Sequence, residues 1–219
     1  MPDWRELATR EQSRYLDGEA RLPDGDADAR QRQLTRMGNA AAGAGLALLM
    51  AGEREAAADW LGRAHDAYRA SWDDAPPESW GRPIAMLKAR ILVDDWAGAE
   101  SDARWTLEQG AAEAASPVGR YAACLALLTL GAWDDARVLA DGLRTRDDFP
   151  PAVGDALAAI AADDPLGYTE AIEAVLESFE TRDEHLEDVP VADTVLALQA
   201  LAARRELAVE LTSPLLPSP

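Results

Sequence analysis

The chain has 219 residues and a formal net charge of -19 at pH 7, from 40 acidic and 21 basic residues. Hydrophobic residues make up 48%, which is enough for one well-packed domain or two small ones. The acidity argues against binding to nucleic acid or to an anionic membrane surface, because both need clustered Lys and Arg. We therefore expect no nucleic-acid partner and no membrane partner.

The N-terminal segment, residues 1–28, is expected to hold one helix, Asp3–Asp17, followed by an acidic linker, Asp17–Asp28. The segment lacks the basic region and apolar run of a secretory signal peptide. The longest apolar run, Ala40–Ala51, is shorter than the roughly 20 residues that a membrane span needs. We therefore expect a cytoplasmic protein.

Residues 29–219 are predicted to form a single α-helical repeat domain. Helical periodicity runs through nearly every segment, and clusters of Pro, Gly or Asp separate the segments. The expected helices pair into four hairpins and a last single helix: Ala29–Ala51 with Glu53–Trp72, Pro83–Val93 with Ala97–Gln109, Pro117–Leu130 with Asp134–Thr145, Pro151–Ala162 with Leu166–Thr181, and then Val191–Arg205. This pattern predicts an all-α fold with a short extended segment at the C-terminus.

Three of the hairpins share a turn pattern, in which a break residue is followed by a large residue and then by an anchor alanine. Gly52 and Gly131 suit the positive φ that often ends a helix. The anchor residues, Ala57, Ala99 and Ala136, are 42 and 37 positions apart, near the tetratricopeptide period of about 34. We therefore expect helical hairpins stacked as a tetratricopeptide-like solenoid, with an irregular bundle as the alternative.

No pattern of catalytic or metal-binding residues can be recognised in the sequence, so we expect no enzyme activity, metal or cofactor. The histidines, His65 and His185, lack a second His or Cys at ligand spacing. Cys124 is the single cysteine and is expected in the core. A Ser/His/Asp set whose members lie far apart in the sequence stays open.

Paired aspartates recur at predicted helix boundaries, where we expect them to cap helix N-termini: Asp73-Asp74, Asp94-Asp95, Asp134-Asp135, Asp147-Asp148 and Asp163-Asp164.

Two of the seven tryptophans bracket a loop that is rich in carboxylates and proline. Aromatic side chains next to carboxylates and rigid prolines are typical of partner-binding hot spots. The alternative is that both tryptophans fold inward and hold the loop in place. The residues that we predict to bind a partner are Trp72, Asp73, Asp74, Glu78 and Trp80.

The kind of charge is as distinctive as its amount. Lys88 is the only lysine, and Asp outnumbers Glu by 23 to 17. Halophilic adaptation favours such a composition, because a carboxylate-rich surface stays hydrated in concentrated salt and its self-repulsion is screened there. A GC-rich genome explains part of the Arg excess, and a surface that mimics DNA is a further alternative. We expect high-salt adaptation to be the main cause, with partner selection second.

The C-terminal third resembles a known family. A helix opened by Asp164-Pro165-Leu166 is followed by an acidic loop and by the helix Val195–Ala203, which ends in Arg204-Arg205. A short segment then closes on Leu216-Pro217, and the Trp-led helix in Ser79–Asp95 adds to the likeness. This order is similar to the polymorphic-toxin immunity protein family numbered 49. The resemblance implies an all-α protein that binds and neutralises a cognate toxin.

We therefore expect a protein-interaction module with a protein partner, and a toxin is the first candidate. An acidic surface suits a basic toxin and would speed association. The first alternative is a helical-repeat scaffold or regulator that binds a peptide or helix of its partner. The second is a helical enzyme, which predicts a deep pocket where carboxylates converge. Homo-oligomerisation stays open.

Overall fold

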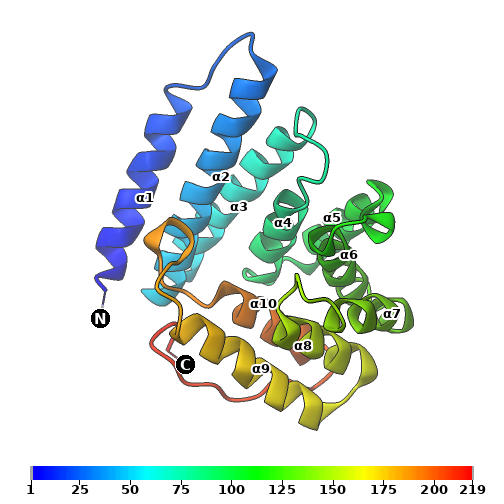
Figure 1. Ribbon diagram of the computed structural model, residues 1–219. Coiled ribbons are helices and arrows are strands. Elements are labelled where there is room, and N and C mark those ends of the chain that lie inside the picture. Colours follow the sequence, from blue (N-terminus) through cyan, green and yellow to red (C-terminus); the bar gives the residue numbers. More distant parts are fainter. Residues whose placement is uncertain (1, 219) are drawn as a thin grey trace.

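The computed structural model describes residues 2–218, which form ten α-helices and two short 3-10 helices and no β-strand (Figure 1). The all-α prediction is confirmed. The elements are α1 (Trp4–Glu19), α2 (Ala27–Met50), α3 (Arg54–Trp72), α4 (Gly81–Ile91), α5 (Trp96–Glu108), η1 (Ala111–Glu113), α6 (Pro117–Thr129), α7 (Trp133–Arg144), α8 (Pro151–Ala162), α9 (Pro165–Glu180), η2 (Leu186–Asp188) and α10 (Asp193–Ala203). Within the same residues, no helix is both long and apolar enough to cross a membrane.

Local sequence signals set most helix ends. Pro117 and Pro151 occupy the first helical positions of α6 and α8, where a missing N–H costs nothing. Gly52 and Gly131 follow the ends of α2 and α6 with φ of 77° and 71°, as predicted. The expected hairpin boundaries therefore agree with the observed helices to within about two residues.

Aspartate pairs cap or flank the N-termini of three helices, as predicted. Asp95 and Asp164 each accept a backbone N–H from the first turn of α5 and α9 at 3.0 Å. Asp134-Asp135 lies in the first turn of α7, where negative charge offsets the helix dipole. The capping prediction is wrong for the other two pairs, because Asp73-Asp74 follows the C-terminal end of α3 and Asp147-Asp148 lies in the loop before α8.

The acidic linker and the last helix differ from their expected bounds, and each difference has a physical cause. The acidic linker is shorter than Asp17–Asp28, because α1 continues to Glu19 and Asp26 Oδ1 caps α2 by accepting from Ala29 N at 2.9 Å. The last helix is also shorter than Val191–Arg205. It begins only at Asp193, since the preceding backbone is held by the C-terminal tail.

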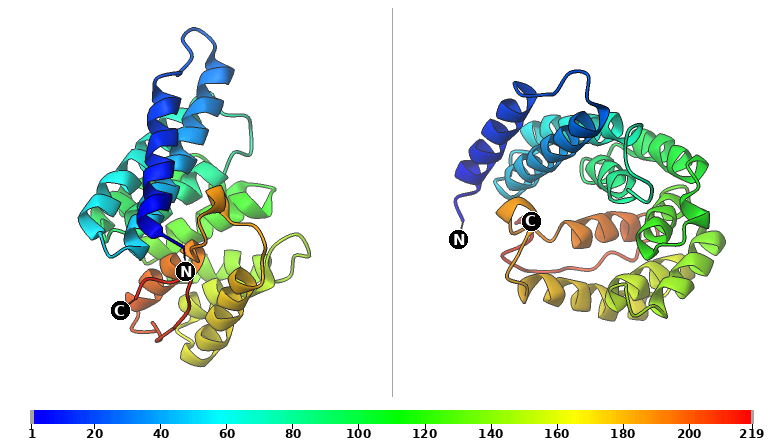
Figure 2. Two further views of the ribbon diagram at one scale, coloured as in Figure 1. Left: turned by 90° about the vertical axis from the view of Figure 1, so that its left-hand side faces the viewer. Right: turned by 45° about the horizontal axis from the view of Figure 1, so that its top comes forward.

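Successive helices pack mainly on their neighbours in sequence, so α1 to α9 form a curved array, and α10 returns to its inner side (Figure 2). The apolar residues of α10 are buried in a core shared with α4, α6, α8 and α9. The tail after Leu207 forms no helix or strand and lies against α9 and α10, where Gln199 exchanges hydrogen bonds with the backbone of Val209. The protein's own C-terminal helix and tail therefore occupy the inner side of the array next to α8 and α9.

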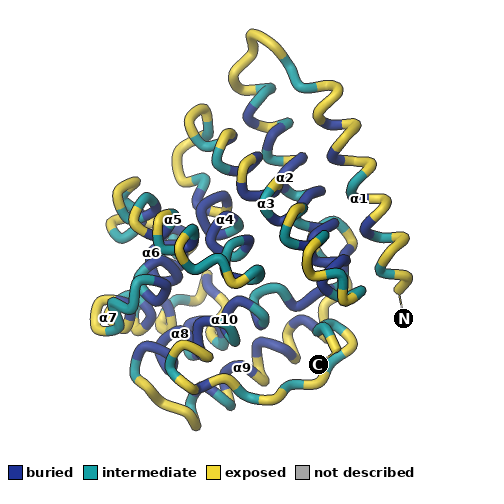
Figure 3. The backbone as a smooth tube through the Cα atoms, turned by 180° about the vertical axis from the view of Figure 1, so that it is seen from behind, coloured by how far each residue is buried: buried dark blue, intermediate teal, exposed yellow. Residues whose placement is uncertain are grey.

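The burial pattern follows this arrangement. Buried segments concentrate where helices face the inside of the array, and exposed residues follow the outer side of α1 and the connecting loops (Figure 3). The anchor residues Ala57, Ala99 and Ala136 are fully buried at the helix contacts. Small side chains at these positions let the paired helices approach closely.

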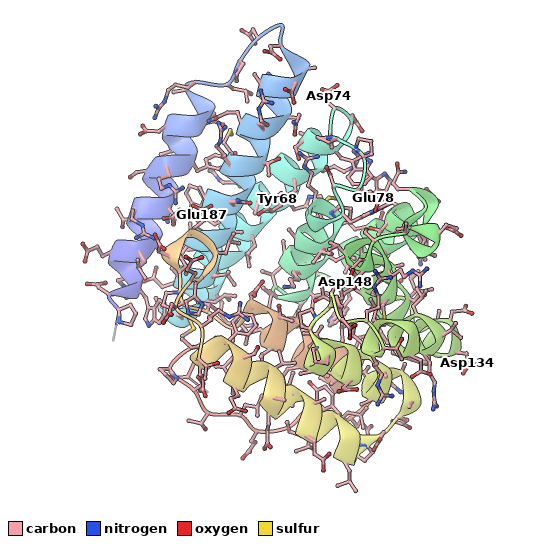
Figure 4. All side chains as sticks on the ribbon, viewed as in Figure 1. Tyr68, Asp74, Glu78, Asp134, Asp148 and Glu187 are labelled. Atoms are coloured by element: carbon pink, nitrogen blue, oxygen red, sulfur yellow. The ribbon has the colours of Figure 1, made fainter. Side chains whose placement is uncertain are left out.

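The two ends of the array meet at η2. Arg10 Nη2 in α1 donates a hydrogen bond of 2.6 Å to the backbone oxygen of Glu187, and Arg14 forms an ion pair with the Glu187 carboxylate (Figure 4). Glu11 is fully buried between the same two arginines, at 2.7 and 2.8 Å. This polar contact joins the C-terminal part of the chain to the first helix.

Two consecutive arginines hold the end of α10. The guanidinium groups of Arg204 and Arg205 lie over the rings of Trp96 and Trp133, with centroid distances of 4.6 and 4.7 Å. Arg205 Nη1 also donates to two carbonyls in the last turn of α8, at 2.8 and 2.7 Å, and Arg204 Nη1 donates to the last carbonyl of α6. The pair therefore stabilises the C-terminal ends of two other helices, where cations are favourable.

Candidate functional site

The predicted partner-binding residues lie at the end of α3 and on the loop that joins it to α4. Trp80 is 6% exposed and packs against Gly119 of α6. Trp72 is half-buried, with its ring centroid 5.3 Å from that of Trp80 and 5.3 Å from that of Trp105, which lies edge-on to it. The two indoles therefore contact the helices and fix the loop, which is the arrangement expected from the alternative interpretation of the sequence.

The three acidic residues of the loop are exposed (Figure 4). Glu78 has a left-handed backbone, with φ of 64°, and its Oε2 accepts hydrogen bonds from Trp80 Nε1 at 3.1 Å and from Ser116 Oγ at 2.5 Å. Asp73 lies 3.3 Å from Arg69, whereas Asp74 has no ion-pair partner among residues 2–218. The structure thus joins Trp72, Trp80 and Glu78 into one packed unit and leaves Asp73 and Asp74 at its solvent side.

The net charge of the protein is negative, because acidic residues outnumber basic ones by 40 to 21, and carboxylates of the same chain pair with most arginines. These arginines lie within 4.0 Å of a carboxylate. The arginines for which no such neighbour occurs within residues 2–218 are Arg36, Arg63, Arg82, Arg120 and Arg182. Many carboxylates remain without a cation, and they give the surface its negative potential.

His65 lies in a polar cluster that the sequence spacing did not reveal. The residue is 7% exposed, its Nε2 lies 3.0 Å from Asp102 of α5, and its Nδ1 lies 3.0 Å from Asp66. Arg90 of α4 approaches the same Asp102 carboxylate at 3.5 Å. Burial alone lowers the pKa of His65, but the two carboxylates outweigh it and raise the pKa above its ordinary value. The cluster joins α3, α4 and α5, and each imidazole nitrogen lies 3.0 Å from a carboxylate oxygen.

A cavity of about 450 Å³ lies between α2, α3 and α4, next to η2 and the start of α10. One end is polar, with Thr35 of α2 and Arg82 of α4 in its wall. The other end is apolar and is formed by Leu46, Leu61 and Leu92. Between them, the hydroxyl of Tyr68 donates a hydrogen bond of 2.8 Å to Asn39 (Figure 4 labels Tyr68).

Two cationic side chains line this cavity. Lys88 Nζ donates to Asp193 at 2.9 Å and to Thr194 at 2.8 Å. Burial by itself lowers the pKa of Lys88, but the Asp193 carboxylate outweighs this and the net pKa is raised. Arg82 is 8% exposed, and its hydrogen bonds within residues 2–218 all go to the neutral side chains of Gln31 and Thr35. No signal in the sequence indicated that Arg82, next to Pro83, would be buried in the wall of a cavity, whereas Lys88 stood out as the only lysine.

Other groups that could support chemistry are accounted for by packing. No cluster of three His, Cys, Asp or Glu side chains within residues 2–218 is placed to hold a metal ion. Cys124 is fully buried, as expected, and burial raises the pKa of its thiol. A hollow of about 500 Å³ on α7, α8 and α9 contains several carboxylates, but Asp141 and Asp155 there are paired with Arg144.

Comparison with known proteins adds no relative. No protein-family model matches the chain, and no curated protein and no solved structure is detectably similar to it. The resemblance to immunity proteins therefore stays a prediction from the residues quoted for it.

Proposed function

We propose that the protein is an interaction module of the immunity type, which binds and neutralises a cognate basic toxin in the cytoplasm. The observation that carries the proposal is the surface charge. Most arginines form ion pairs inside the molecule, so the charge left for a partner is negative. A basic partner would be attracted and oriented by such a surface.

We also propose that the hairpins are a tetratricopeptide-like solenoid with a drifted period. The buried anchor alanines and the left-handed glycines at equivalent turns support this assignment. Solenoids commonly bind peptides on their inner side, but here α10 lies there. A partner would therefore be bound from outside, which favours a folded toxin over the peptide or helix that a scaffold or regulator would take.

The loop between α3 and α4 is the contact region that we favour. Trp72, Trp80 and Glu78 hold it rigidly, so little conformational entropy is lost when a partner binds. Asp73 and Asp74 stand at its exposed side, where they can pair with Arg or Lys of a toxin.

Co-expression with the toxin encoded beside the gene tests the proposal. We expect the wild-type protein to prevent killing and the charge-reversed variant Asp73→Lys/Asp74→Lys to lose protection. The matched control is Asp183→Lys/Glu184→Lys, which makes the same change in net charge on an exposed loop at another place. Killing that continues in the presence of the wild-type protein, with no complex on gel filtration, would refute the proposal.

A further inference from the structure

We propose that the cavity between α2, α3 and α4 binds a small amphipathic monoanion, a carboxylate with an unbranched alkyl chain of medium length. The carboxylate lies at Arg82 and the chain extends toward Leu46, Leu61 and Leu92. The proposal does not depend on toxin binding.

The balance of buried charges indicates that the Arg82 guanidinium can accept an anionic ligand. The two charged residues with the least exposure, apart from His65, are Glu11 and Arg82. Glu11 is matched by two arginines at 2.7 and 2.8 Å. Arg82 has no carboxylate within 4.0 Å among the described residues, although the chain carries 40 acidic residues, and its Nη1 makes no hydrogen bond. A buried charge without a counterion is costly unless a ligand supplies one.

The number of cations in the cavity wall that no carboxylate neutralises favours a ligand with a single negative charge. Lys88, the other cation in the wall, is already neutralised by Asp193 at 2.9 Å. The Arg82 guanidinium is therefore left, and its Nη1, which makes no hydrogen bond within residues 2–218, can donate to one carboxylate. A doubly charged group such as a phosphate monoester would bring a second charge for which the cavity wall has no free cation.

The shape of the cavity favours an elongated ligand. Its wall follows α4 from Arg82 to Leu92, ten residues that span about 15 Å at the helical rise of about 1.5 Å per residue. Along α2 the lining changes in the same direction, from Thr35 to Leu46. The volume of about 450 Å³ falls in the range of small-molecule sites. Polarity at one end and aliphatic side chains at the other fit a carboxylate and an alkyl chain.

An approach route exists at the polar end. A shallow hollow next to Arg82 is lined by Asp28, Arg32 and Arg36 of α2. Asp28 pairs with Arg32, whereas exposed Arg36 has no carboxylate within 4.0 Å among residues 2–218. An anion that enters through this hollow would pass Arg36 on its way to Arg82.

Isothermal titration calorimetry with decanoate tests the proposal on the full-length protein. We expect saturable binding of one decanoate per chain. Arg82→Gln should weaken binding at least about 10-fold, because charge-assisted hydrogen bonds are lost. Ala85→Leu, which fills the cavity and leaves Arg82 in place, should weaken it by a similar factor. The control Arg104→Gln removes an exposed charge on α5 and should bind as the wild type does.

Two further probes separate the parts of the site. Decanol has the chain without the charge, and acetate has the charge without the chain, so each should bind at least about 10-fold more weakly than decanoate. The proposal is overturned if decanoate gives no saturable binding below about 1 mM, if acetate binds as tightly as decanoate, or if Ala85→Leu binds decanoate as the wild type does. Ala85→Leu decides the question even if Arg82→Gln does not fold.

Discussion

Replacing Arg205 by alanine should loosen the C-terminal helix from the rest of the array. The Arg205 guanidinium donates two hydrogen bonds to carbonyls in the last turn of α8 and lies over the Trp133 ring. It also lies 3.4 Å from Asp163, the residue that follows α8. One side chain thus connects α10 to two helices that are distant in sequence.

The expected loss can be worked from these contacts. A hydrogen bond with a charged partner contributes about 1.5–3 kcal/mol, and a cation–π contact about 0.5–2 kcal/mol. The side chain keeps 18% of its surface exposed, so water can replace part of what is lost. We therefore expect Arg205→Ala to lower the free energy of unfolding by about 2–4 kcal/mol, a large share of a typical total of about 5–15 kcal/mol.

Urea denaturation followed by circular dichroism measures this loss. Arg205→Lys keeps the charge but loses the planar fork, so we expect it to lose about half as much stability as the alanine variant. The control Arg137→Ala removes an arginine whose one carboxylate contact within residues 2–218 is exposed and 3.8 Å long, and it should cost less than about 0.5 kcal/mol. If Arg205→Ala stays within about 0.5 kcal/mol of the wild type, the assignment of this residue as the link between α10 and the array is wrong.

Three other predictions concern packing, pH and salt. Gly119→Ala should destabilise by about 1–3 kcal/mol, because an added Cβ would lie 2.3 Å from Ala114 Cβ and 2.8 Å from Trp80 Cδ1. Gly62→Ala, where an added Cβ would meet no atom within 4 Å, should stabilise α3 by about 0.5–1 kcal/mol, and urea denaturation measures both changes. The pKa of His65 is raised in the folded state, so its stabilising contribution is complete below the unfolded value of about 6.5 and is lost as the pH rises through the folded value. Urea titrations across this range should therefore show a fall in wild-type stability that is absent in His65→Gln, and an equal slope in both would contradict the assignment. If the acidity reflects halophilic adaptation, helicity should fall when the protein is moved from about 1 M salt to low salt, whereas a full circular-dichroism signal at about 0.1 M would count against it.

The helices could be predicted from the sequence because their ends depend on neighbouring residues. Pro117 and Pro151 start helices through their own fixed φ, and Gly131 ends one through its tolerance of positive φ. Asp73-Asp74 shows the limit of the same logic. An acidic pair at a boundary can follow a helix as easily as precede one, so its residue type alone does not tell which end it marks.

The closure of the array and the cavity could not be predicted, because they depend on contacts between residues distant in sequence. Arg205 meets α8 across 45 residues, and Arg82 meets Thr35 across 47. Within residues 2–218 no carboxylate lies near Arg82, and this property of the folded chain cannot be inferred from spacing in the sequence. The Trp72 to Trp80 loop lies between these cases, since the sequence identified the segment but left open whether the indoles face inward.

Complex formation between the purified protein and the toxin encoded beside its gene tests the central claim most directly. We predict a stoichiometric complex on gel filtration that the Asp73→Lys/Asp74→Lys variant does not form and that the Asp183→Lys/Glu184→Lys control retains. Separate elution of the wild-type protein and the toxin at micromolar concentrations, in both low and high salt, would contradict the proposed function.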